Sequence, residues 1–99
     1  MSEASGADAI RLSPEDNVAT VLRAVTSGET LRVRCAGDVT EVQAQEPIPL
    51  CHKVSLGAIA TGGAVVKYGQ KIGETLAPIA PGRHVHVHNM RSARWERSE

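Results

Sequence analysis

Glycine and proline interrupt this chain at short intervals, and between them apolar residues alternate with polar ones. Leu31, Val33 and Cys35 alternate with arginines, and residues 83–90 (RHVHVHNM) alternate along their whole length. The apolar residues are almost entirely Val, Ile, Leu and Ala, with no Phe, one Trp and one Tyr. Small and β-branched side chains between turn residues favour short strands. The sequence therefore predicts a mostly β fold.

One segment departs from this alternation and predicts a short N-terminal helix. Ser13 or Asp16 can cap it, and Pro14 fits the first helical position. Gly28 supplies a stop signal. Four apolar residues between these signals have the spacing of one helical face: Val18, Val21, Leu22 and Val25.

The length of the chain and the positions of its turn residues predict a single domain with two tails. Residues 1–9 (MSEASGADA) are small and polar, and we expect them to form a mobile tail. The domain is expected over residues 10–90, followed by a charged tail over residues 91–99. No internal repeat is evident in the sequence.

The charge and hydropathy of the chain exclude several classes of function. Eleven basic residues balance eleven acidic ones, which argues against nucleic-acid binding through a broad basic surface. The chain has neither an 18-residue apolar stretch nor a signal-peptide pattern, so a cytoplasmic protein without membrane association is expected. Cys35 and Cys51 lack CxxC spacing and are expected to be reduced thiols. A disulfide, or a metal role for Cys51 beside His52, is the alternative.

The histidines of residues 84–88 are the sharpest chemical signal. On a strand, residues two apart point to the same face, so His84, His86 and His88 would line one face and the valines between them would face the core. Neutral imidazole is a good metal ligand, and the pattern predicts contact with a metal or a substrate. A complete site needs a further ligand, from His52 or from a partner. Alternatively, the histidines only form hydrogen bonds on an exposed strand.

Two further pairs of residues carry functional groups near turns. His52 and Lys53 follow the proline-rich connector of residues 46–49, which can place them at the rim of a site. Lys67 and Tyr68 end an apolar strand before a glycine, where the ammonium can reach a carboxylate and the phenol can donate a hydrogen bond. The alternatives are a surface basic pair in the first case, and a snorkelling lysine with a packing tyrosine in the second.

Four segments together resemble the N-terminal SAF-type domain of altronate and galactarate dehydratases. Their order and separations match this family from about residue 10 to residue 90, and Leu50 and Cys51 depart from its common pattern. The segments are residues 16–19 (DNVA), 49–54 (PLCHKV), 63–73 (GAVVKYGQKIG) and 82–89 (GRHVHVHN).

The resemblance implies a β-clip fold and membership of a lyase family that dehydrates hydroxylated sugar acids with a divalent metal, usually Fe²⁺, with Mn²⁺ or Zn²⁺ as alternatives. A chain this short is similar to the small subunit of sulfolactate sulfo-lyase, which works with a large catalytic subunit. By matching position, the resemblance implies catalytic roles for His52, Lys53, Lys67 and Tyr68, substrate contacts at Lys67 and Asn89, and metal contacts at His84, His86 and His88.

Three functional hypotheses follow. The first is a lyase subunit, inactive alone, that shares a site for a sugar acid or a sulfonated hydroxy acid with a large subunit. The second is a non-catalytic carbohydrate-binding or assembly module of the SAF type. The third is an interaction subunit whose histidines pack at an interface. A homodimer is a further possibility for a small, edge-rich β domain.

Overall fold

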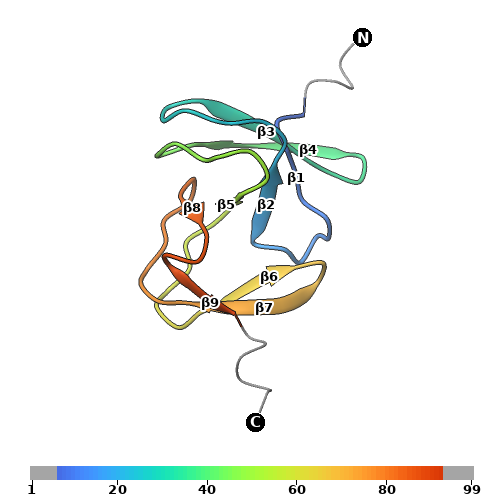
Figure 1. Ribbon diagram of the computed structural model, residues 1–99. Coiled ribbons are helices and arrows are strands. Elements are labelled where there is room, and N and C mark those ends of the chain that lie inside the picture. The colour runs from blue at the N-terminus through green and yellow to red at the C-terminus, as the bar shows by residue number, and fades with distance from the viewer. Residues whose placement is uncertain (1–6, 93–99) are drawn as a thin grey trace.

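The computed structural model describes residues 7–92, which form two β-sheets (Figure 1). The larger sheet has the strand order β4-β3-β1-β2-β5-β8, and the smaller has the order β6-β7-β9. The mostly β expectation is confirmed. The strands are β1 (Ala9–Ile10), β2 (Val18–Val21), β3 (Thr30–Cys35), β4 (Asp38–Gln43), β5 (Lys53–Ser55), β6 (Ala64–Lys67), β7 (Gln70–Thr75), β8 (His84–Val85) and β9 (Met90–Ser92).

Strand β2 separates two hydrophobic clusters because both of its faces are buried. Ala19 and Val21 belong to the first cluster, which includes Leu31 of β3 and Val54 of β5. Val18 belongs to the second cluster, which also contains residues of β6 and β8. Burying both faces of one strand removes apolar surface from water on each side and fixes the register of its neighbours.

The helix predicted after Ser13 is wrong, because residues 7–92 contain no helix. Val18 and Val21 lie in β2, Val25 forms an isolated bridge with Ile48, and Leu22 is exposed. The helix-like spacing of these residues arises from a strand that is buried on both faces, where β-branched valines pack well.

The expected helix start is a turn closed by Asp16. The Ser13 backbone N–H donates to Asp16 Oδ2 at 3.1 Å. The Asp16 carboxylate also accepts hydrogen bonds from the backbone N–H groups of Tyr68 and Gly69, at 3.1 and 2.8 Å. The residues that resemble a helix cap therefore join two distant segments instead.

The described residues extend into both predicted tails. Ala9 is fully buried and pairs with Val21 and Val33, and β9 includes Arg91 and Ser92. The remainder of the predicted tails, residues 1–6 and 93–99, lies outside the described residues. Within the described part of the chain, no helix has the length and apolar character needed to cross a membrane.

One turn geometry occurs four times. In each case a bridged apolar residue (Val25, Ile48, Ile59 or Ile79) is followed by a turn whose first carbonyl accepts from the fourth N–H, and then by a strand. The third residue of each turn has a positive φ, as a type II turn requires. The four turns are residues 26–29, 49–52, 60–63 and 80–83, and their third residues are Gly28 (φ 93°), Cys51 (φ 73°), Gly62 (φ 78°) and Gly82 (φ 83°).

In two of these turns the identity of the third residue matters, either because another backbone atom lies close to it or because it is not a glycine. A Cβ at Gly82 would lie 2.0 Å from the Gln43 carbonyl oxygen, so only glycine fits there. Cys51 instead holds a side chain in the left-handed region, which disfavours residues with a Cβ. The turn of residues 49–52 ends in His52, and the turn of residues 80–83 leads directly into His84 of β8.

We expect Cys51→Gly to stabilise the protein by about 0.5–1 kcal/mol, because relief of left-handed strain exceeds the added entropy of glycine in the unfolded chain. Urea denaturation followed by circular dichroism measures this change. Cys51→Ala is the matched control, because it removes the thiol, keeps the Cβ and should leave the unfolding free energy unchanged. A less stable Cys51→Gly variant would contradict the strain argument.

Candidate functional site

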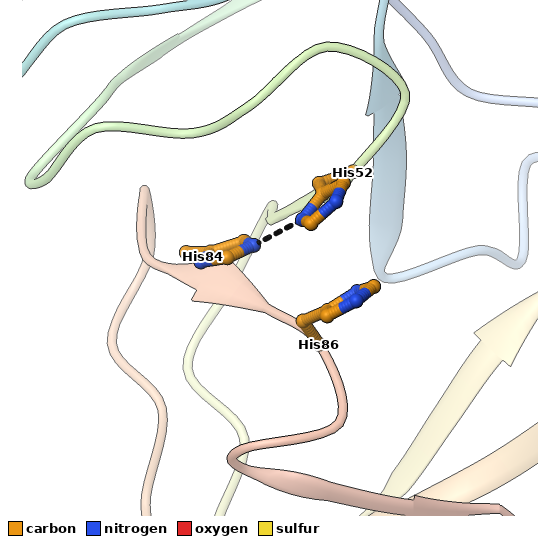
Figure 2. Close-up of side chains that lie close together, drawn as sticks. All are labelled: His52, His84 and His86. Carbon is orange, nitrogen blue, oxygen red and sulfur yellow. Dashed lines mark hydrogen bonds between the residues drawn. The ribbon is translucent and has the colours of Figure 1, made fainter.

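Three histidines from two distant segments meet beside β5 and β8. One ligand nitrogen from each of His52, His84 and His86 lies within 4.8 Å of the others. His52 Nδ1 and His84 Nε2 are 2.7 Å apart and share a hydrogen bond (Figure 2). The rings of His52 and His86 stack with a centroid distance of 3.9 Å. All three side chains are half-buried.

Two of the four repeated turns position His52 and His84. His52 is the last residue of the turn before β5, and His84 is the first residue of β8, directly after the turn of residues 80–83. Antiparallel pairing of β5 with β8 places Val54 opposite His84 and Lys53 opposite Val85. The pairing of Val54 with His84 places His52, two residues before Val54, close to β8, where its ring meets that of His84.

The chain leaves the strand after Val85 and turns through residues 86–89, where a regular strand was predicted. Asn89 closes this turn: its Oδ1 accepts from the His86 N–H at 2.9 Å, and its Nδ2 donates to the His84 carbonyl at 2.7 Å. Val85 is buried as expected, but Val87 is 74% exposed because the turn carries it away from the core.

Asn89 was predicted to contact substrate, but its side-chain oxygen and nitrogen both bind the backbone of the histidine segment. A second polar group holds the same segment, because Glu46 Oε2 accepts from the His84 N–H at 2.9 Å. The geometry gives Asn89 a positioning role for His84 and His86.

His88 lies at the margin of the histidine cluster. Its exposed ring is 4.9 Å from that of His84, at an interplanar angle of 42°, and its nitrogens are not part of the group that lies within 4.8 Å. The predicted metal set was His84, His86 and His88, with His52 as a possible further ligand. The structure groups His52 with His84 and His86, because the turn at residue 86 displaces His88.

The surroundings favour neutral imidazoles. Burial lowers the pKa of His84, and the nearby His88, His52 and His86 lower it further, against a weaker opposite effect of Glu46. Burial also lowers the pKa of His86, with further contributions from His52, Lys53 and His88. The Nδ1 of His86 is buried and has no hydrogen-bond partner among residues 7–92. Neutral rings with available lone pairs can bind a metal or accept a proton.

Two lysines lie near the histidine cluster. Burial lowers the pKa of Lys53, and the charge of Lys67 lowers it further. Lys67 Nζ lies 5.0 Å from the centre of the Tyr68 ring, within the range of a cation–π contact. Tyr68 is 62% exposed. The charge of Lys67 thus reaches Lys53, whereas Tyr68 lies on the surface.

Several polar residues that shape this region were missed in the sequence. Buried Asp16 ties β2 to the end of β6, and buried Ser55 joins the turn of residues 80–83 by donating to the Ala80 carbonyl and accepting from the Arg83 N–H. Thr20 carries a buried hydroxyl without a hydrogen-bond partner in the described part of the chain. Only the polarity of Ser55 and Thr20 among apolar strand neighbours could have indicated them.

An open cleft of about 730 Å³ is lined in part by Arg83 and Asn89, which flank the histidine segment in the sequence. Its walls are mainly apolar, from residues 58–60 and 78–80, and its polar groups are Glu46, Arg83 and Asn89. Arg83 and Glu46 form a long ion pair of 3.9 Å in it. The cleft is large enough for a small ligand.

Comparison with known proteins gives consistent results. Residues 7–93 match the model of the altronate/galactarate dehydratase SAF domain. The chain is 40% identical over 83 residues to altronate dehydratase of Escherichia coli K12, and 34% identical over 83 residues to that of Bacillus subtilis 168. It is 42% identical over 52 residues to (2R)-sulfolactate sulfo-lyase subunit alpha of Paracoccus pantotrophus.

The relatives differ greatly in length. The matched region covers 84% of this chain but only 16% of each altronate dehydratase. The match to the Paracoccus subunit covers 52% of this chain and 78% of that subunit. The chain therefore corresponds to a small part of the dehydratases and to most of a separate subunit.

We expect Asn89→Ala to lower the free energy of unfolding by roughly 1–3 kcal/mol, because it leaves the His86 N–H and the His84 carbonyl without their side-chain partner. Asn89→Asp keeps the acceptor for His86 and should lose less. Chemical denaturation measures both, and Val87→Ala on the same turn is the control, with a change within about 0.5 kcal/mol. Equal stability of Asn89→Ala and wild type would contradict the positioning role.

Proposed function

This chain belongs to the altronate/galactarate dehydratase SAF domain family, and we propose that it is the small component of a lyase. The proposed reaction removes water from a hydroxylated sugar acid, or sulfite from a sulfonated hydroxy acid, at a site shared with a large catalytic subunit. The observation that carries the proposal is the convergence of His52, His84 and His86 beside Lys53. The assignment to the β-clip fold is part of the same proposal.

The three histidines fit a divalent metal. Their nitrogens lie within 4.8 Å of one another, and His86 Nδ1 is a buried nitrogen without a hydrogen-bond partner among the described residues. The nitrogens of His52 and His84 that share a hydrogen bond would both be available to a metal if the donor ring adopted its other tautomer, with its proton on its second ring nitrogen. Imidazole ligands suit Fe²⁺, with Zn²⁺ and Mn²⁺ as alternatives.

The remaining groups match the needs of the reaction. A bound metal supplies a Lewis acid that polarises the departing hydroxyl or the adjacent acid group. Lys53 and Lys67 bind carboxylate oxygens as point charges. Burial lowers the pKa of Lys53, so its neutral form is the alternative: Lys53 Nζ is then a candidate acceptor for the proton beside the carboxylate, and Lys67 alone binds the carboxylate oxygens. Asn89 and Glu46 hold the backbone that orients His84.

The lengths of the relatives support a large partner. This chain matches 16% of altronate dehydratase, and a separate protein named as a subunit matches it by itself. The half-buried histidines and the exposed Val87 lie at the surface, where another polypeptide can complete the site. We therefore expect the isolated chain to be inactive on sugar acids and on sulfolactate.

A second candidate is a free-standing SAF-type module that binds a carbohydrate. The open cleft between residues 58–60 and 78–80 favours it, because its mainly apolar wall carries a few polar groups. Thermal-shift measurements on the isolated chain separate the two functions. Stabilisation by a neutral sugar, together with no response to divalent metals, would favour the module.

For the metal, we expect Zn²⁺ or Co²⁺ to bind the isolated chain, and His86→Ala to weaken that affinity by at least about tenfold. Isothermal titration calorimetry measures the affinity. His88→Ala is the matched control, because its ring is exposed and outside the three-nitrogen group, and it should bind as wild type does. Equal metal affinity of wild type and His86→Ala would refute the site and favour a plain interaction subunit.

For the activity, we expect turnover only when this chain is combined with a large dehydratase subunit encoded beside it. His86→Ala in the reconstituted complex should reduce kcat at least about a hundredfold, while His88→Ala changes it less. An unchanged rate with His86→Ala, or full activity of the large subunit alone, would overturn the proposed role.

A further inference from the structure

Tyr68 lies at the tip of the β6–β7 hairpin in a backbone conformation that tyrosine seldom adopts (Figure 1). Lys67 pairs with Gln70, so Tyr68 and Gly69 form a two-residue loop. Both loop residues have a positive φ, of 60° and 70°. Such a loop favours Asn or Gly at its first position, because a bulky side chain is strained in the left-handed region. The backbone of this loop therefore selects against a tyrosine.

Buried Asp16 holds the strained loop in place. Its carboxylate accepts hydrogen bonds from the backbone N–H groups of Tyr68 and Gly69, and a third from that of Ser13. The two turns pack closely, since a Cβ at Gly69 would lie 3.1 Å from Glu15 Oε1 and 3.4 Å from Ser13 Oγ. A left-handed residue persists when its surroundings fix it in this way, and such residues are common at functional sites.

Asn17 fixes the strand that leads into the loop. Its Oδ1 accepts from the Val66 N–H at 2.8 Å, and its Nδ2 donates to the Ala64 carbonyl at 2.9 Å. Asn17 directly precedes β2 of the larger sheet, whereas β6 belongs to the smaller sheet, so these bonds join the two sheets. Two of the segments that carry the family resemblance, residues 16–19 and 63–73, thus act together to hold the tip of the hairpin.

The side chain on this fixed loop is largely open to solvent. The ring of Tyr68 is the chain's only phenol and is 62% exposed, with Lys67 Nζ over it at 5.0 Å from its centre. Among residues 7–92, three residues other than glycine have a positive φ, and only Tyr68 of these has a large side chain. Tyrosine is prominent among the residues that contribute most to protein interfaces, and a ring fixed before binding loses little conformational entropy on docking.

We propose that Tyr68 is the anchor by which this chain docks onto its large subunit, with the ring inserted into an apolar pocket of that subunit. The inference rests on the proposed function, and the relatives supply the partner: the matched region is 16% of altronate dehydratase and 78% of a sulfo-lyase subunit. Asp16 and Asn17 are positioning residues for the anchor. Tyr68 is thereby assigned to the interface, in place of the catalytic role that the resemblance implied.

The test measures the affinity between this chain and the large subunit encoded beside it, by isothermal titration calorimetry. We expect Tyr68→Gly to weaken binding at least about thirtyfold, because it removes the anchor. Tyr68→Phe keeps the ring and should bind within about threefold of wild type. Ala36→Gly is the matched control, since it relaxes the same left-handed conformation (φ 55°) in the β3–β4 hairpin and should leave the affinity unchanged.

The stability of the isolated chain separates an anchor from a residue that the fold needs. The Tm of Tyr68→Gly should be unchanged or rise by up to about 5 °C, because glycine relieves the left-handed strain and the lost ring is mostly exposed. A fall in Tm of more than about 2 °C would mean that the ring serves the fold, and the inference would be overturned.

Chemical modification follows the wild-type residue directly. Tyr68 is the only tyrosine, so nitration of tyrosine, measured by mass spectrometry, reports on this residue alone. We expect rapid nitration of the isolated chain and at least about tenfold slower nitration in the complex, because docking buries the ring. Equal nitration rates, or unchanged affinity of Tyr68→Gly, would refute the anchor.

Turnover of the reconstituted complex distinguishes docking from catalysis. At a saturating concentration of the small chain, Tyr68→Gly should reach a kcat within about twofold of wild type, since the anchor sets only the affinity. Loss of kcat in Tyr68→Phe at unchanged affinity would show that the hydroxyl acts on the substrate, which would overturn the inference.

The two proposals fail separately. If the complex forms and turns over but Tyr68→Gly binds as wild type does, only the anchor is refuted. If binding depends on Tyr68 but His86→Ala leaves metal affinity and turnover unchanged, the lyase role fails and the docking surface remains. Absence of binding between the wild-type chain and the large subunit would overturn both.

Discussion

Burial of β2 on both faces is the constraint on which the rest of the structure depends. Its side chains contribute to two hydrophobic clusters, one on each face. Its backbone pairs with β5 in an antiparallel ladder, which fixes the position of β5. Strand β5 in turn pairs with the two residues of β8. The register of these pairings sets the position of β8, because a shift of one residue would turn its side chains to the opposite face. The histidine cluster is therefore as well defined as the core beneath it.

The sequence predicted those features that depend on near neighbours. Alternation predicted the strands and the burial of Val85, and the prolines predicted a connector before His52. Features that depend on distant partners were not predictable. The helix failed because a doubly buried strand can mimic helical spacing, as Val18 and Val21 do. Asp16 was interpreted as a possible helix cap, because only the folded chain brings its partners, the backbone N–H groups of Tyr68 and Gly69, near to it.

The charged groups of the site are arranged unevenly. Three imidazoles lie together, and burial lowers the pKa of His84 and of His86, whereas the positive charge of Lys67 lowers the pKa of Lys53. Glu46 is the carboxylate that acts on His84, and its effect on the pKa of that ring is the weakest of those present. Buried imidazoles and neighbouring like charges lower the stability of the folded protein. Groups in such surroundings are typical of binding sites, where a bound anion or metal offsets that cost.

Cys51 has a practical consequence of its own. Its thiol is exposed, lies one residue from His52, and occupies a turn position where the other three turns carry glycine and no side chain. Because glycine serves at the same position of the other turns, the turn does not require this side chain. A fluorophore or spin label can therefore be attached there without displacing a packed group. Cys35 is less accessible, which makes the attachment selective. The protein thus carries a built-in handle from which occupancy of the neighbouring histidines can be followed spectroscopically.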